Sequence, residues 1–106
     1  MSHEYRDRIY IRKDIILALT EFGELKQTSL LSHCGLNIVA HKDILEDLEK
    51  KEFIKKIEEP WGSKKIIKYS VTDKGIRMCR QVLDPYEELF PRKNKQQLGN
   101  KVSETF

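Results

Sequence analysis

The stretch KKIEEPWGSKKIIKYSVTDKG, residues 55–75, decides the fold of this chain. It holds two runs rich in β-branched residues and lysine, as strands often are, and Pro60 and Gly62 between them mark a turn. The sequence therefore predicts a β-hairpin with strands in FIKKI (residues 53–57) and KIIKYSVT (residues 65–72). On both sides of this hairpin the apolar residues follow a helical period instead.

Two helices are predicted ahead of the hairpin, each ended by a glycine. IRKDIILALTEFG (residues 11–23) spaces its isoleucines and leucines as a helix does, and Gly23 is expected to end it in the left-handed conformation. LKQTSLLSHCG (residues 25–35) is shorter, with Thr28 expected to begin the helix and Gly35 to end it.

A third helix is predicted in LNIVAHKDILEDLEKKEFI, residues 36–54, with Asn37 as its N-cap. Ile44, Leu45 and Leu48 are its expected core positions. The tight join at Gly35 gives residues 25–54 the layout of a helix-turn-helix, in which the second helix of the pair can enter a DNA groove.

The helical pattern resumes after the hairpin in TDKGIRMCRQVL, residues 72–83, with Thr72 as the expected cap. Pro85 is expected to end or sharply kink this helix near Asp84, because proline lacks the N–H that continues a helix. A fresh turn would then begin, with Asp84 as its cap. Beyond Pro91 the sequence is polar and has no clear period.

The order helix, helix, helix, hairpin, helix is that of a winged helix. The predicted fold class is α+β and mainly α, with a three-helix core, a β-hairpin wing and a short C-terminal helix. The predicted parts are an N-terminal arm (residues 1–8), a winged-helix domain (9–84), a short C-terminal helical turn (85–91) and a polar basic tail (92–106).

Composition limits the functions that this fold can serve. The chain of 106 residues has a net charge of +3, and the residues from 92 onward account for all of it, so residues 1–91 are formally neutral. A nucleic-acid surface must therefore be a local patch. No apolar run is long enough to cross a bilayer, and the N-terminus is charged where a signal peptide is apolar, so a cytoplasmic protein with no membrane partner is expected.

Three segments carry a resemblance to a known family. TSLLSHCGLN (residues 28–37) is similar to the second helix and turn, LEDLEKKEFI (45–54) to the exit from the third helix, and YSVTDKG (69–75) to the junction after the wing. Over residues 9–84 the chain resembles small winged-helix DNA-binding proteins of the archaeal ArnR-like kind and, more loosely, the MarR and PadR regulators. Relatives commonly have a glycine at the position of Glu52.

The resemblance implies a transcriptional regulator or chromatin protein that binds double-stranded DNA in the nucleoid. It also implies a homodimer formed through the first helix and the C-terminal helix. The third helix would contact bases and phosphates through its outward positions Ile38, Val39, Ala40, Lys42 and Asp43. Its cap Asn37 is a further candidate DNA contact. Ile38 and Val39 are apolar, so an alternative hypothesis makes this surface a docking site for a protein of a transcription or replication assembly.

The wing supplies the predicted phosphate contacts through lysines and one tryptophan. These residues are Lys55, Lys56, Trp61, Lys64, Lys65 and Lys68. Lysine also protects exposed strand edges, so a merely solvated hairpin is the alternative. Trp61 either contacts a partner at the wing tip or folds back on the hairpin.

Other polar groups give weaker signals. Arg6, Arg8, Arg12 and Lys13 either contact phosphate or are solvated at the start of the first helix. His33, Cys34, His41 and Cys79 lack the spacing of a zinc site, and no acid, base and nucleophile group is recognisable. The sequence therefore predicts no catalytic residue, no metal and no cofactor, and a protein that is not an enzyme.

Overall fold

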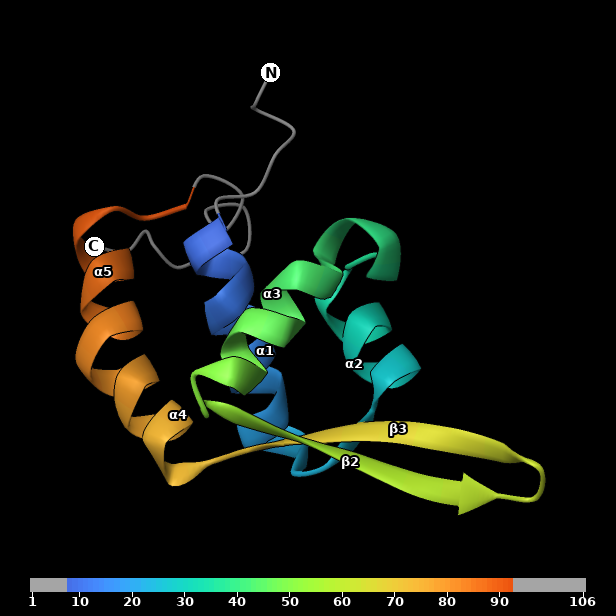
Figure 1. The fold of residues 1–106 in the computed structure, drawn as a ribbon. Coiled ribbons are helices and arrows are strands. Elements are labelled where there is room, and N and C mark those ends of the chain that lie inside the picture. Colours follow the sequence, from blue (N-terminus) through green and yellow to red (C-terminus); the bar gives the residue numbers. More distant parts are fainter. Residues whose placement is uncertain (1–7, 93–106) are drawn as a thin grey trace.

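The computed structural model describes residues 8–92 and has the predicted winged-helix fold (Figure 1). Its elements follow the order α1 (Arg8–Phe22), β1 (Leu25–Lys26), α2 (Gln27–Cys34), α3 (Ile38–Lys50), β2 (Ile54–Trp61), β3 (Lys64–Val71), α4 (Asp73–Met78), a π-helical turn η2 (Cys79–Leu83) and α5 (Asp84–Leu89). The N-terminal arm up to residue 7 and the tail from residue 93 lie outside the described residues.

The helix-turn-helix forms as predicted, except at the start of α2. Gly23 and Gly35 both have positive φ, at 82° and 67°. The N-cap of α2 is Lys26, which makes no side-chain cap bond, and Thr28 lies inside the helix, so the predicted start at Thr28 is wrong. The helix begins earlier because the preceding residues Leu25 and Lys26 pair with β3 and fix the direction of the chain.

The sheet has three antiparallel strands in the order β1-β3-β2. The hairpin strands run further than predicted, to the pair Trp61 and Lys64, so Gly62 and Ser63 alone form the turn. Pro60 is therefore a strand residue, which an edge strand such as β2 tolerates. The two-residue strand β1 was not predicted, because it is too short to show a period.

The core lies where α1, α2, α3 and η2 pack together and against the inner end of the sheet. It includes the predicted positions on α3, and its buried residues are Ile11, Ile15, Ile16, Ala18, Leu19, Leu30, Leu31, Ile44, Leu45, Leu48, Ile54, Tyr69, Cys79 and Leu83. The outer part of the hairpin takes little part in this core, and in Figure 1 it extends well beyond the helices. The wing is thus held at its base and exposed at its tip.

The expected break at Pro85 is wrong, since α4, η2 and α5 form one continuous helical segment in Figure 1. The N–H of Asp84 bonds to the carbonyl of Cys79, five residues back, and the flanking residues keep helical dihedrals. This wider turn accommodates a proline that a regular helix would not. Asp84 is consequently not a cap, whereas Thr72 caps the helix as predicted, accepting from Gly75 N at 3.0 Å.

Candidate nucleic-acid interface

The first turn of α3 presents an apolar outer surface. Asn37 caps the helix, with its side-chain oxygen 2.7 Å from Val39 N and 3.3 Å from Ala40 N. This leaves Val39 89% exposed and Ala40 exposed, whereas Ile38 is half-buried and packs against the core. Of the predicted apolar contact residues on this helix, Val39 is thus the one fully available to a partner.

Two of the four acidic residues of α3, Asp43 and Asp47, form ion pairs with α1. Arg8 pairs with Asp43, and Arg12 Nη2 lies 2.9 Å from Asp47 Oδ2. The bond from Arg8 lowers the pKa of Asp43. Bonds from Lys51 and then Arg12 lower the pKa of Asp47. Arg8 and Arg12 are thus ion-paired within the chain, their contact with phosphate stays a prediction, and Arg6 lies outside the described residues.

The charge of α3 changes along its length. Residues 38–50 contain four acidic side chains against Lys42 and Lys50, a net charge of −2, and every acid comes after Lys42. Lys42 is exposed and lies 3.9 Å from Glu46, a distance at which a surface pair is weak. The start of α3 is therefore the end of the helix best suited to approach phosphates.

The wing carries five lysines against two glutamates, a net charge of +3 over residues 54–71. Three of the lysines are already paired: Lys65 with Glu58 at 3.2 Å, Lys56 with Glu58 at 3.7 Å, and Lys68 with Glu59 at 3.1 Å. The bond from Lys65 lowers the pKa of Glu58, and the bond to Glu59 raises the pKa of Lys68.

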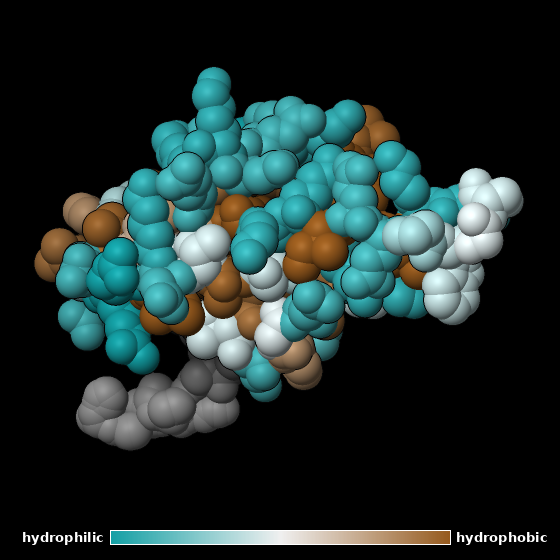
Figure 2. Space-filling model, turned by 60° about the horizontal axis from the view of Figure 1, so that its bottom comes forward, coloured by the Kyte–Doolittle hydropathy of each residue, from teal (hydrophilic) through white to brown (hydrophobic). Residues whose placement is uncertain are grey.

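Two wing lysines, Lys55 and Lys64, have no ion pair with any residue between 8 and 92. Lys64 lies directly opposite Trp61 in the register, so both side chains leave the same face of the hairpin. Trp61 is 67% exposed and does not fold back on the strands. The pale tip of the wing is visible at the right of Figure 2, beyond the mostly hydrophilic body. A rigid aromatic ring and an unpaired cation therefore share the tip.

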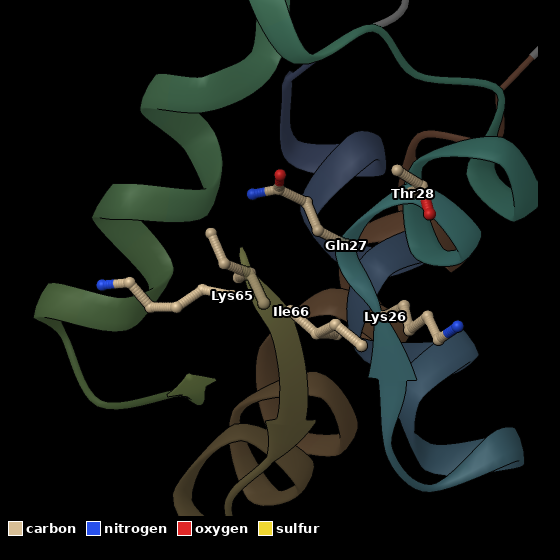
Figure 3. Close-up of a pocket in the computed structure, with 6 residues that line it drawn as sticks. Lys26, Gln27, Thr28, Lys65 and Ile66 are labelled. Atoms are coloured by element: carbon tan, nitrogen blue, oxygen red, sulfur yellow. The ribbon is translucent and has the colours of Figure 1, made fainter. Parts of the chain in front are cut away.

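A shallow groove of about 260 Å³ separates the start of α2 from β3. Figure 3 shows Lys65 and Gln27 extending to one side of this groove and Lys26 to the other. Gln27 Nε2 also lies 3.3 Å from the Tyr69 hydroxyl. Because the two lysines diverge, the groove is not a closed anion pocket. It does add Lys26 and Gln27 to the polar groups beside the wing, which the sequence analysis missed.

The remaining candidate groups lie apart. Cys34 is half-buried on α2 and Cys79 is buried on η2, and the two do not form a disulfide. His41 Nδ1 accepts from the Asn37 backbone N–H at 3.1 Å. Within residues 8–92 no group of three or more His, Cys, Asp or Glu side chains is placed to hold a metal ion. Among the described helices none is long and apolar enough to cross a bilayer.

Comparison with known proteins agrees with this geometry. A family model described as "Winged helix-turn-helix" matches residues 5–89, which is most of the chain. The chain belongs to the winged helix-turn-helix family. Among curated proteins no sequence matches this winged helix.

Several solved structures share its fold at low sequence identity. BpsR of Bordetella bronchiseptica, described for the regulation of its DNA binding by 6-hydroxynicotinic acid, is 12% identical (TM-score 0.62, covering 76% of this chain and 60% of BpsR). Reduced AbfR bound to DNA is 19% identical (TM-score 0.63, covering 91% of this chain and 69% of AbfR). ZitR of Lactococcus lactis, a zinc-responsive MarR family member, is 18% identical (TM-score 0.57, covering 89% of this chain and 62% of ZitR). This winged helix thus spans about two thirds of the length of these proteins or less.

Proposed function

We propose that this winged helix binds double-stranded DNA as a transcriptional regulator or chromatin-associated protein of the nucleoid. The observation that carries the proposal is a projecting wing with unpaired Lys55 and Lys64, on a helix-turn-helix whose second helix exposes its first turn. AbfR, of similar fold, has been solved on DNA, and the resemblance to archaeal ArnR-like proteins points the same way. The proposed activity is binding, without catalysis, metal or cofactor.

The proposed contacts divide between the two elements. The start of α3 faces the major groove, where Asn37 fixes the first turn, Val39 with the half-buried Ile38 meets the bases, and Lys42 meets phosphate. The wing follows the DNA backbone through Trp61 and its lysines, which are Lys55, Lys56, Lys64, Lys65 and Lys68. Phosphate contacts would then supply most of the affinity and make it strongly dependent on salt.

We further propose a homodimer built on α1 and the C-terminal helix. Val82 (54% exposed), Leu89 (73%) and Phe90 (57%) are exposed hydrophobic residues at helical spacing. In Figure 2 brown atoms gather at the left end of the molecule, where α4 and α5 lie in Figure 1. The unbroken helix from Asp73 to Leu89 is long enough to pack against a second copy.

A second candidate function is a protein-interaction module of a transcription or replication assembly. Two observations favour it: the outermost residue of α3 is an exposed valine, and residues 38–50 have a net charge of −2. In this case Val39 would contact a protein in place of DNA. Val39→Asp is a clean probe because the side chain is exposed, whereas the half-buried Ile38 also supports the fold.

The test is a charge reversal at the wing. The double variant Lys64→Glu, Lys65→Glu is expected to lose duplex binding at moderate salt. Arg77→Glu, Arg80→Glu is the matched control, since it changes the net charge equally at exposed positions on the helical segment of α4 and η2. Loss in the wing variant alone supports the proposal. Equal binding by wild type and wing variant contradicts it, and a complex broken only by Val39→Asp favours the protein module.

A further inference from the structure

The polar groups at the start of α3 that recognise base edges in other proteins are engaged within the chain. An Asn amide recognises adenine through its oxygen and nitrogen together, but the Asn37 oxygen is held by Val39 N and Ala40 N. His41 Nδ1 is bound to the backbone of Asn37. An acidic side chain can accept a hydrogen bond from cytosine, but Asp43 is paired with Arg8.

The groups left facing outward are methyl groups. Val39 is 89% exposed and Ala40 is exposed beside it, both on the first turn of α3. Lys42 is the nearest exposed cation on this surface; its ion pair with Glu46 is long at 3.9 Å, and its side chain is flexible enough to reach a phosphate. In the major groove the C5-methyl group of thymine is the one apolar feature that a base pair presents. The chemistry of this turn therefore matches thymine and little else.

From these contacts we propose that this winged helix selects DNA through thymine methyl groups, which pack against Val39 and Ala40 in the major groove. The inference rests on the proposed DNA binding and adds the basis of its sequence preference. Preferred sites carry thymines where the first turn of α3 enters the groove. Each methyl group buried there strengthens binding roughly fourfold, from the usual gain for one buried carbon.

The experiment compares an A·T-rich duplex with the same duplex in which every thymine is replaced by deoxyuridine. The replacement removes only the C5-methyl groups and keeps the phosphates, the Watson–Crick edges and the minor groove. Binding is measured by fluorescence anisotropy at one fixed salt concentration. Wild-type protein is expected to bind the thymine duplex at least roughly fourfold more tightly than the uracil duplex.

Val39→Ser separates a contact with the methyl group from an effect of the methyl group on DNA shape. The variant removes the valine methyls at an exposed position, and its thymine-to-uracil preference is expected to fall toward one. Thr28→Ser is the matched control, since it also removes a methyl group at an exposed position but lies on α2, outside the proposed DNA and dimer contacts, and it should keep the wild-type preference.

The outcomes separate this inference from the proposed function. Tight but equal binding of both duplexes overturns the thymine contact and leaves DNA binding intact. A preference that survives Val39→Ser also overturns it, because the methyl group then acts through DNA shape. If wild type binds neither duplex, both proposals fail. A thymine preference that is lost in Val39→Ser and kept in Thr28→Ser supports the inference.

Discussion

Replacing Glu87 by Gln should remove a large electrostatic contribution to the stability of the fold. The Glu87 carboxylate lies 2.9 Å from Lys13 Nζ on α1 and 2.8 Å from Arg92 Nε, and its side chain is only 11% exposed. Arg92 also makes two bonds to Asp14 of α1, at 2.9 and 3.0 Å. This charge cluster joins α5 and the residues that follow it to α1.

The size of the effect follows from the pKa of Glu87. Burial raises this pKa, but the bonds from Arg92 and Lys13 outweigh burial and lower it from 4.5 to about 2. A shift of this size corresponds to about 3 kcal/mol of folding free energy. Because the folded pKa is the lower one, this stability is fully present above pH 4.5 and is lost as the pH falls from 4.5 to about 2.

The assay is urea unfolding of wild type and Glu87→Gln across pH. At pH 7 the variant should be less stable by about 3 kcal/mol, and the two curves should converge near pH 2. Glu88→Gln, at the exposed neighbouring position, is the control and should follow the wild type. A Glu87→Gln difference that stays constant from pH 7 to pH 2 would refute the electrostatic account.

Three further predictions concern single residues. Glu52 has a φ of 67°, so Glu52→Gly should raise the free energy of unfolding by about 0.5–1 kcal/mol, and no gain in urea unfolding would contradict the strain. Gly75→Ala should lower the free energy of unfolding by about 1–3 kcal/mol although Gly75 lies in a helix, because a Cβ there would be 2.2 Å from Phe53 O. A stabilised variant in the same assay would show that the structure relaxes to remove this contact. Leu89→Asp should convert the proposed dimer to a monomer in analytical ultracentrifugation, and an unchanged mass would place the dimer contact elsewhere or exclude a dimer.

Local chemistry made most of the fold predictable from the sequence. The caps Asn37 and Thr72 act within three residues, and Gly23 and Gly35 end their helices through their own backbone conformations. The sequence also showed Glu52 at a position where relatives commonly have a glycine. In the structure Glu52 has a φ of 67°, a backbone conformation that strains a residue other than glycine. Such features depend on short stretches of chain, which is why a single sequence reveals them.

Interactions between distant segments were not predictable. Arg8 and Arg12 meet Asp43 and Asp47 across 35 residues, so the sequence gives no sign that they are occupied. The effect of Pro85 was not predictable for the same reason, because it depends on the backbone hydrogen bonds of the whole helix. At the candidate site, the sequence supplied the wing lysines, but only the structure shows that Glu58 and Glu59 already neutralise part of them.

The most direct test of the central claim is the affinity of the purified protein for a mixed-sequence duplex and for its own promoter region, measured across salt concentrations. The six lysines proposed to meet phosphate predict a slope of log affinity against log salt of about −5 per protein chain. Lys64→Gln should make this slope shallower by about 1. Absence of binding to either duplex at low salt would contradict the account and redirect attention to Val39 as a contact for a protein partner.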